Sequence, residues 1–220
     1  MVVPCLFSSC SKAIADRMPD LFPQAWLDLQ AMSGWEVVAV VLAIAYLVLA
    51  IFERIECWYA AFFSTLIFIF LFWDASLLME SALNVYYLLM AVYGWLQWRG
   101  YLNKSTQTKI HLWPLRNHVL AIGVIFILAA VTGTMLAKNT EAAFPYLDSF
   151  TTWAAVVTTF MVARKVLENW WYWLVVNPIS VFLYVERGLV LTALLYVAYV
   201  VMSVYGLLKW RQRYRLQQVT

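Results

Sequence analysis

Long apolar runs separated by short charged or polar stretches dominate the chain from residue 35 onwards. Each run is long enough, or nearly so, to cross about 30 Å of hydrocarbon as a helix, which takes roughly 20 residues. Helices are expected because lipid cannot satisfy backbone hydrogen bonds and no alternating strand pattern appears. Seven membrane helices are predicted, at Trp35–Phe52, Cys57–Trp73, Leu77–Trp98, Val119–Leu136, Phe144–Ala163, Asn169–Tyr184 and Leu189–Leu208.

The composition agrees with an all-α membrane protein. Of the 220 residues, 65% are apolar and 12% are charged, whereas soluble domains average about 45–50% and about 25%. A water-soluble enzyme and a nucleic-acid-binding protein are therefore excluded. The three cysteines, Cys5, Cys10 and Cys57, are an odd number, and their spacing predicts neither a disulfide framework nor a metal site. Nothing else in the sequence indicates a metal or another cofactor.

The distribution of basic residues predicts the orientation of the helices. With the N-terminus outside and seven crossings, eleven of the 15 Lys and Arg residues lie on the cytoplasmic side. The positive-inside rule describes this asymmetry, so we expect the N-terminus outside and the C-terminus inside. The cytoplasmic basic residues are Arg54, Arg99, Lys104, Lys109, Arg116, Arg164, Lys165, Lys209, Arg211, Arg213 and Arg215.

An internal repeat relates two parts of the chain at a spacing of 112 residues. The recurring residues include Glu56 and Glu168, Trp58 and Trp170, Gly94 and Gly206, and Trp98 and Trp210. Each copy holds three predicted helices, and the fourth helix between them restores the orientation of the second copy. The predicted architecture is therefore 3+1+3 with parallel repeats, which is typical of transporters that bind substrate near the membrane midplane. The alternative is that duplication only produced a stable bundle.

The repeat divides the chain into five segments. An N-terminal extension containing a short interfacial helix covers residues 1–33, and the first three-helix repeat covers 34–99. The cytoplasmic loop and linker helix follow at 100–140. The second repeat covers 141–211, and a basic cytoplasmic tail covers 212–220.

One face of the sixth predicted helix combines aromatic and hydrogen-bonding side chains. At about 100° per residue, Trp170, Trp173, Asn177, Ser180 and Tyr184 share one arc of the helix. An amide near the middle of a membrane helix is costly unless it faces a cavity or a partner. Flat rings beside an amide favour a site for a flat, polar and cationic ligand. The alternative is that Asn177 and Ser180 only hold helices together.

Other polar side chains complete the predicted site. Asn84 and Tyr87, one turn apart on the third helix, are expected to contact either the ligand or a neighbouring helix. Asp148, at the outer entrance of the fifth helix, and Trp58, the repeat equivalent of Trp170, are candidate gate residues. No nucleophile with a base, metal cluster or carboxylate pair lies within the spans, so an enzyme is not expected.

The sequence resembles the PnuC family of bacterial nicotinamide riboside transporters over about residues 35–210. The resemblance rests on the run Ala163 to Asn177, on Phe144-Pro145, and on Tyr93-Gly94-Trp95. The family's W-x-x-W-x-x-x-N pattern falls on Trp170, Trp173 and Asn177. The resemblance implies a fold similar to full-length SWEET sugar transporters. It also implies facilitated diffusion of nicotinamide riboside (vitamin B3) across the bacterial inner membrane for NAD synthesis, with trapping by a separate cytoplasmic kinase.

The residues agree with such a substrate but leave alternatives open. A pyridinium ring gains roughly 0.5–2 kcal/mol over a Trp face, and the midplane has no Lys or Arg to bind a phosphate. We therefore expect a uniporter that rejects the mononucleotide and couples to no ion. Thiamine or another flat vitamin is an alternative substrate, and a non-transporting receptor is an alternative function. Membrane lipid is an expected partner, nucleic acid is not, and the oligomeric state stays open, a homo-oligomer included.

Overall fold

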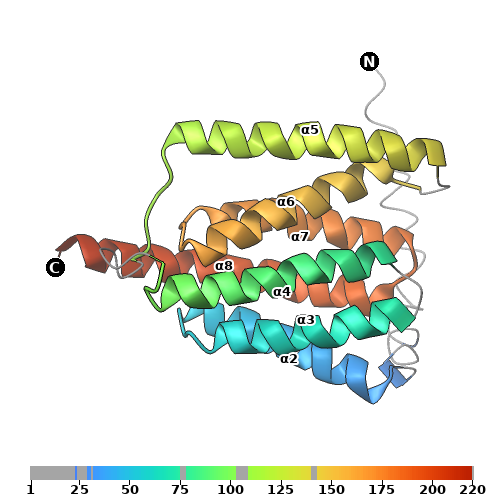
Figure 1. Cartoon of the computed structure of the whole chain (residues 1–220), viewed down its shortest axis with the longest axis horizontal. Coiled ribbons are helices and arrows are strands. Elements are labelled where there is room, and N and C mark those ends of the chain that lie inside the picture. The colour runs from blue at the N-terminus through green and yellow to red at the C-terminus, as the bar shows by residue number, and fades with distance from the viewer. Residues whose placement is uncertain are drawn as a thin grey trace.

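The computed structural model describes residues 32–74, 78–102, 109–139 and 143–219, together with residues 23, 29 and 30. The interfacial helix expected around Trp26 lies outside the described residues. Within them the chain is all-helical and forms seven long helices (Figure 1). Their bounds are α2 Gly34–Ile51, α3 Cys57–Asp74, α4 Leu78–Trp98, α5 Leu115–Asn139, α6 Pro145–Ala163, α7 Asn169–Glu186 and α8 Val190–Val219.

The ends of the helices follow local chemistry more closely than the apolar runs do. Ser33 caps α2 through a capping box, in which its hydroxyl accepts from the Glu36 backbone and its backbone donates to the Glu36 carboxylate. Helix α8 continues to Val219, well beyond Leu208, where the apolar run ends. The Lys, Arg, Gln and Leu residues after Leu208 are good helix formers, so the basic tail prolongs the helix. The sequence prediction ended this helix too early.

Four of the described helices, α2, α3, α5 and α8, are long and apolar enough to cross a membrane by length and composition. Helices α4, α6 and α7 have comparable lengths of 21, 19 and 18 residues but contain no equally apolar stretch of 18 residues. Part of the difference comes from polar side chains such as Asn84, Thr151 and Asn177, which face the interior. Helices α4, α6 and α7 therefore all contribute polar groups to the centre of the bundle.

The helices pack as two groups of three with one helix outside them. Helix α3 lies between α2 and α4, while α7 packs against both α6 and α8. The groups meet where α4 contacts α6 and where α2 contacts α8. Helix α5 runs along one side of the bundle and packs on α6 (Figure 1). This arrangement encloses a central space between six helices and leaves α5 at the periphery.

Most buried apolar residues lie at one end of the bundle, where α2 turns into α3 and α6 turns into α7. We call this end the paired-turn end, defined by residues 52–56 and 164–168. Each turn contains a non-glycine residue with positive φ, Glu53 at 54° and Lys165 at 53°. The same backbone hydrogen bond closes both turns. The N–H of Arg54 donates to the carbonyl of the residue five positions earlier, and the N–H of Val166 does the same, each at 2.9 Å. The two turns therefore have the same local geometry at positions 112 apart.

Two tryptophans pack face-on against glycines at this end. A Cβ atom on Gly94 would lie 2.3 Å from Cζ2 of Trp58, and one on Gly206 would lie 2.5 Å from Cη2 of Trp170. Any side chain there would displace a buried ring. Each tryptophan also meets another indole edge-on at 5.4 Å, Trp58 against Trp98 and Trp170 against Trp210. The paired-turn end is thus densely packed with aromatic rings, and we call the cluster of Trp58, Trp98, Trp170 and Trp210 the aromatic plug.

Candidate functional site

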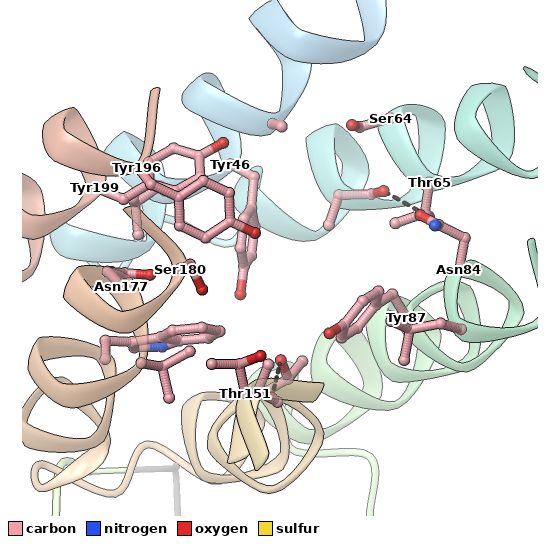
Figure 2. A pocket seen from close by; sticks show the side chains of 18 of the residues that line it. Tyr46, Ser64, Thr65, Asn84, Tyr87, Thr151, Asn177, Ser180, Tyr196 and Tyr199 are labelled. Carbon is pink, nitrogen blue, oxygen red and sulfur yellow. Dashed lines mark hydrogen bonds between the residues drawn. The ribbon is translucent and has the colours of Figure 1, made fainter. Parts of the chain in front are cut away.

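A cavity of about 370 Å³ lies between the two groups of three helices (Figure 2). Every helix from α2 to α8 lines it except α5. Its aromatic lining consists of Tyr46, Trp58, Phe68, Tyr87, Trp173, Tyr184, Tyr196 and Tyr199. Its polar lining consists of Ser64, Thr65, Asn84, Thr151, Thr152, Thr159, Asn177, Ser180 and Ser203. Among the described residues, no Asp, Glu, Lys, Arg or His lines it, so the cavity suits an aromatic ligand without negative charge.

Most of the residues predicted as a site come together on this cavity. Those that line it are Trp173, Asn177, Ser180 and Tyr184 from α7, Asn84 and Tyr87 from α4, and the candidate gate residue Trp58 from α3. Figure 2 shows Asn177 and Ser180 on one side of the space and Asn84 and Tyr87 across from them. The polar face of α7 is therefore turned inward, as expected for an amide in the middle of the bundle.

Trp170 departs from the expected site. Its side chain is 1% exposed and lies in the core of the paired-turn end, against Gly206 and Trp210, outside the cavity lining. It shares the helix face of Trp173 but sits three residues nearer the turn, about 4.5 Å along the axis. The expectation that both tryptophans share one site is therefore corrected: of the two, only Trp173 lines the cavity.

Asp148 also lies away from the cavity lining. Its carboxylate pairs with the guanidinium of Arg187, which follows the last residue of α7. This ion pair joins the start of α6 to the end of α7, at the end of the bundle opposite the paired turns. Asp148 therefore lies at the start of α6, and its partner belongs to the same three-helix group.

A hydrogen-bond chain fixes Asn177 at the cavity wall. The side chain is 3% exposed, and its Nδ2 donates to Oγ of Ser203 at 3.1 Å. Ser203 in turn donates to the backbone carbonyl of Tyr199 at 2.7 Å. Asn177 on α7 is thus tied to α8 through its nitrogen.

Several lining residues were not predicted from the sequence. Tyr46 comes from α2, whereas Tyr196, Tyr199 and Ser203 form the inner face of α8. The rings of Tyr184 and Tyr196 lie 5.0 Å apart, and those of Tyr196 and Tyr199 5.3 Å apart. The spacing of i, i+3 and i+7 on α8 was the available signal, since it places these side chains on one helix face.

The lining residues also follow the 112-residue spacing. Eight pairs of positions at this spacing both line the cavity, so each three-helix group contributes an equivalent set. Tyr87 and Tyr199 are the identical aromatic pair and lie on opposite walls (Figure 2). The pairs are Ala43 and Ala155, Leu47 and Thr159, Ala61 and Trp173, Ser64 and Val176, Thr65 and Asn177, Phe68 and Ser180, Asn84 and Tyr196, and Tyr87 and Tyr199.

Reciprocal contacts close the paired-turn end. The indole Nε1 of Trp98 on α4 donates to the carbonyl of Ala163 at the end of α6, at 3.1 Å. The indole Nε1 of Trp210 on α8 donates to the carbonyl of Ala50 near the end of α2, also at 3.1 Å. Each group of helices therefore holds the other by an indole-to-carbonyl hydrogen bond beneath the cavity.

A bundle of membrane-length helices with a polar and aromatic cavity at its centre is typical of membrane carriers. The chain is a multi-pass membrane transporter by this criterion. It belongs to the nicotinamide mononucleotide transporter family, whose sequence model matches residues 33–212. This confirms the family resemblance inferred from the motifs.

Named relatives and a solved structure agree with this assignment. The chain is 24% identical over 204 residues to the nicotinamide riboside transporter PnuC of Escherichia coli, covering 81% of this chain and 85% of the relative. It is 27% identical over 136 residues to the riboflavin/roseoflavin transporter RibM of Streptomyces davaonensis, covering 57% and 61%. Its fold is similar to a crystal structure of the vitamin B3 transporter PnuC, with a TM-score of 0.66, 23% identity and coverage of 89% and 88%.

Proposed function

We propose that this protein is a uniporter that carries nicotinamide riboside into the cell by facilitated diffusion, for NAD synthesis. The observation that carries the proposal is the cavity, which brings Trp173 and Asn177 together in a chamber whose lining has no charged side chain. The E. coli relative named as a nicotinamide riboside transporter supports the same substrate. The proposed contacts are Trp173, Asn177, Ser180, Tyr184, Asn84 and Tyr87, without Trp170.

The chemistry of the cavity favours the riboside over its phosphorylated form. A pyridinium cation stacked on Trp173 gains roughly 0.5–2 kcal/mol, more when the site is dry. A phosphate would need charge-assisted donors such as Arg or Lys, and the described lining has none. The nucleoside therefore fits the cavity, while a mononucleotide would bring two negative charges without partners.

We propose a 3+1+3 architecture with parallel repeats, in which 34–99 and 141–211 are the repeats and 100–140 contains the linker helix. The matching turns at Glu53 and Lys165, the glycines under Trp58 and Trp170, and the paired lining positions support it. The basic residues support an orientation with the N-terminus outside the inner membrane and the paired-turn end in the cytoplasm. Residues 1–33 and 212–220 lie outside the repeats.

Transport then proceeds by rocking of one repeat against the other around the cavity. In this mechanism the bonds of Trp98 and Trp210 break when the end that we assign to the cytoplasm opens. Trp58 lines the cavity from the top of this plug, so its ring moves when the plug opens. Asp148 and Arg187 gate the outer end. A separate cytoplasmic kinase traps the delivered riboside, and the carrier itself needs no cofactor and performs no reaction.

Another flat vitamin is the alternative substrate, and one observation favours it. The relative from Streptomyces davaonensis is named a riboflavin/roseoflavin transporter. The aromatic lining would accept an isoalloxazine ring as well as a pyridinium ring. Competition between the two vitamins separates these substrates.

The test is uptake of radiolabelled nicotinamide riboside into liposomes that contain the purified full-length protein. The proposal predicts saturable uptake. Unlabelled riboside should inhibit this uptake by competition, whereas the mononucleotide and riboflavin should not. A Trp173→Ala variant should lose most of the uptake. Equal competition by riboflavin would contradict the assignment of nicotinamide riboside as the preferred substrate. Uptake no higher than in protein-free liposomes would contradict the proposal that the protein is a carrier.

A further inference from the structure

The hydrogen bonds around Ser203 determine which side of the Asn177 amide faces the cavity. Oγ of Ser203 lies 2.7 Å from the carbonyl oxygen of Tyr199. Two oxygens at this distance repel unless a proton lies between them, and a carbonyl has no proton to give. The Ser203 hydroxyl therefore donates to Tyr199 and has only lone pairs left for Asn177.

The amide of Asn177 must then turn its nitrogen toward Ser203. An amide nitrogen donates two hydrogen bonds and an amide oxygen accepts, so only the nitrogen can satisfy the lone pairs of Ser203. The observed Nδ2 to Oγ distance of 3.1 Å agrees with this assignment. Both side chains are buried, at 3% and 1% exposure, so reversing the amide would set two oxygens against each other without water between them.

The same polarity recurs around the cavity. Nδ2 of Asn84 donates to the carbonyl of Glu80 at 2.9 Å, so Oδ1 of Asn84 is likewise not used in this bond. The hydroxyls of Thr65 and Thr159 lie 2.7 and 2.8 Å from carbonyls one turn earlier and are committed as donors there. The oxygens of these groups offer acceptors to a ligand, each amide nitrogen keeps one further N–H, and the tyrosine hydroxyls can either donate or accept.

We infer that Ser203 is a positioning residue that makes the cavity select a carboxamide over a carboxylate. Its lone pairs hold Asn177 with Oδ1 toward the ligand, where an N–H group of a carboxamide can donate. A carboxylate at the same place is acceptor-only and negative, and it meets an oxygen instead of a donor. This inference rests on the proposed function, and it names the part of the nicotinamide ring that Asn177 recognises.

The experiment measures binding of nicotinamide riboside and of nicotinic acid riboside to the detergent-purified full-length protein by isothermal titration. These probes differ only in the carboxamide and the carboxylate. A buried site built for an N–H donor rejects an analogue without it by large factors, and we expect a preference of at least about 100-fold for the amide. Ser203→Ala frees the Asn177 amide to rotate, so the preference should fall below about tenfold.

Two further variants distinguish positioning from folding. Ser203→Thr keeps the hydroxyl and should keep the wild-type preference. Ser64→Ala is the matched control, because Ser64 also lines the cavity and donates to a backbone carbonyl, that of Ala39 at 2.8 Å, whereas the hydrogen bond of Asn177 goes to Ser203. It should change both affinities alike and leave their ratio unchanged. A general folding defect would likewise lower both affinities without moving the ratio.

The outcomes separate this inference from the function on which it rests. Wild-type protein that binds both ribosides within about threefold of each other overturns the role of Ser203 and leaves the carrier proposal standing. A ratio that survives Ser203→Ala overturns it as well. Protein that binds neither riboside rejects the proposed substrate itself.

Discussion

Nζ of Lys165 lies 3.1 Å from Oε2 of Glu53, and the two residues occupy the same position in their respective turns, 112 residues apart. The pair therefore joins the two groups of helices at equivalent positions of their turns. Nη1 of Arg213 also donates to Glu53, at 3.0 Å, and Nζ of Lys165 lies 4.5 Å from the ring centre of Trp98. One carboxylate thus holds two cations beneath the cavity.

Removing the charge of Glu53 should loosen the paired-turn end. The side chains of Glu53 and Lys165 are only 7% and 13% exposed, and breaking a buried ion pair costs about 3 kcal/mol or more. Glu53→Gln should lower the thermal unfolding temperature in detergent more than Lys165→Met, because the latter leaves Glu53 its bond to Arg213.

The control for this prediction is Arg54→Gln. Arg54 pairs with Glu56 in the same turn, but the two side chains are 61% and 48% exposed. Exposed pairs contribute about 1 kcal/mol at most, so this variant should unfold near the wild-type temperature. Equal losses in Glu53→Gln and Arg54→Gln would contradict the role of the buried pair.

The two tryptophans of α7 should behave differently when replaced. Trp173 lines the cavity, so Trp173→Leu should weaken binding of nicotinamide riboside by about tenfold or more, through loss of cation–π attraction and contact area. Trp170 is packed in the core, so Trp170→Phe should lower thermal stability but leave affinity within about threefold. Titration and thermal unfolding on the same samples check both; a large affinity loss only in Trp170→Phe would reverse the assignment.

The glycines under the buried tryptophans should not tolerate a methyl group. Gly94→Ala or Gly206→Ala places Cβ within 2.5 Å of a ring atom, and such overpacking costs about 1–3 kcal/mol. Gly123→Ala on α5 is the comparison, because nothing lies within 4 Å of its Cβ and alanine favours the helix by about 0.5–1 kcal/mol. Thermal unfolding should therefore move in opposite directions, and a tolerated Gly206→Ala would refute the packing argument.

Transport should not depend on a proton gradient. Among the described residues, the cavity lining carries no Asp, Glu, His or Lys that could bind and release a proton between its two openings. Addition of a protonophore to the proteoliposomes, or a change of external pH between 6 and 8, should leave initial uptake of nicotinamide riboside unchanged. Uptake that follows an imposed proton gradient would require a proton site that this account lacks.

The sequence predicted the helices because lipid makes long apolar runs unambiguous, and it predicted the inner face of α7 because polar groups there must turn inward. It did not separate Trp170 from Trp173. Helical periodicity gives the direction of a side chain but not its depth, and the two rings differ only in depth. Tyr196 and Tyr199 were missed for a related reason, since α8 carries aromatic residues on several faces and only packing shows which face is inward.

The two halves share a backbone arrangement but differ in the side chains that they present to the cavity. The repeat predicts a symmetric frame, and the paired lining positions are occupied accordingly. At equivalent positions the first copy has Ala61 and Thr65 where the second has Trp173 and Asn177. Only the second copy therefore presents an indole ring and an amide to the cavity at these positions. An asymmetric ligand with a flat ring is accommodated by such a cavity.

The most direct test of the central claim is titration of purified protein with nicotinamide riboside, with its mononucleotide, thiamine and riboflavin in parallel, and with Trp173→Ala and Asn177→Ala as variants. The account predicts saturable binding of the riboside alone, lost in both variants. Binding of the mononucleotide with equal affinity, or riboside binding that survives both substitutions, would contradict a phosphate-free site built on Trp173 and Asn177.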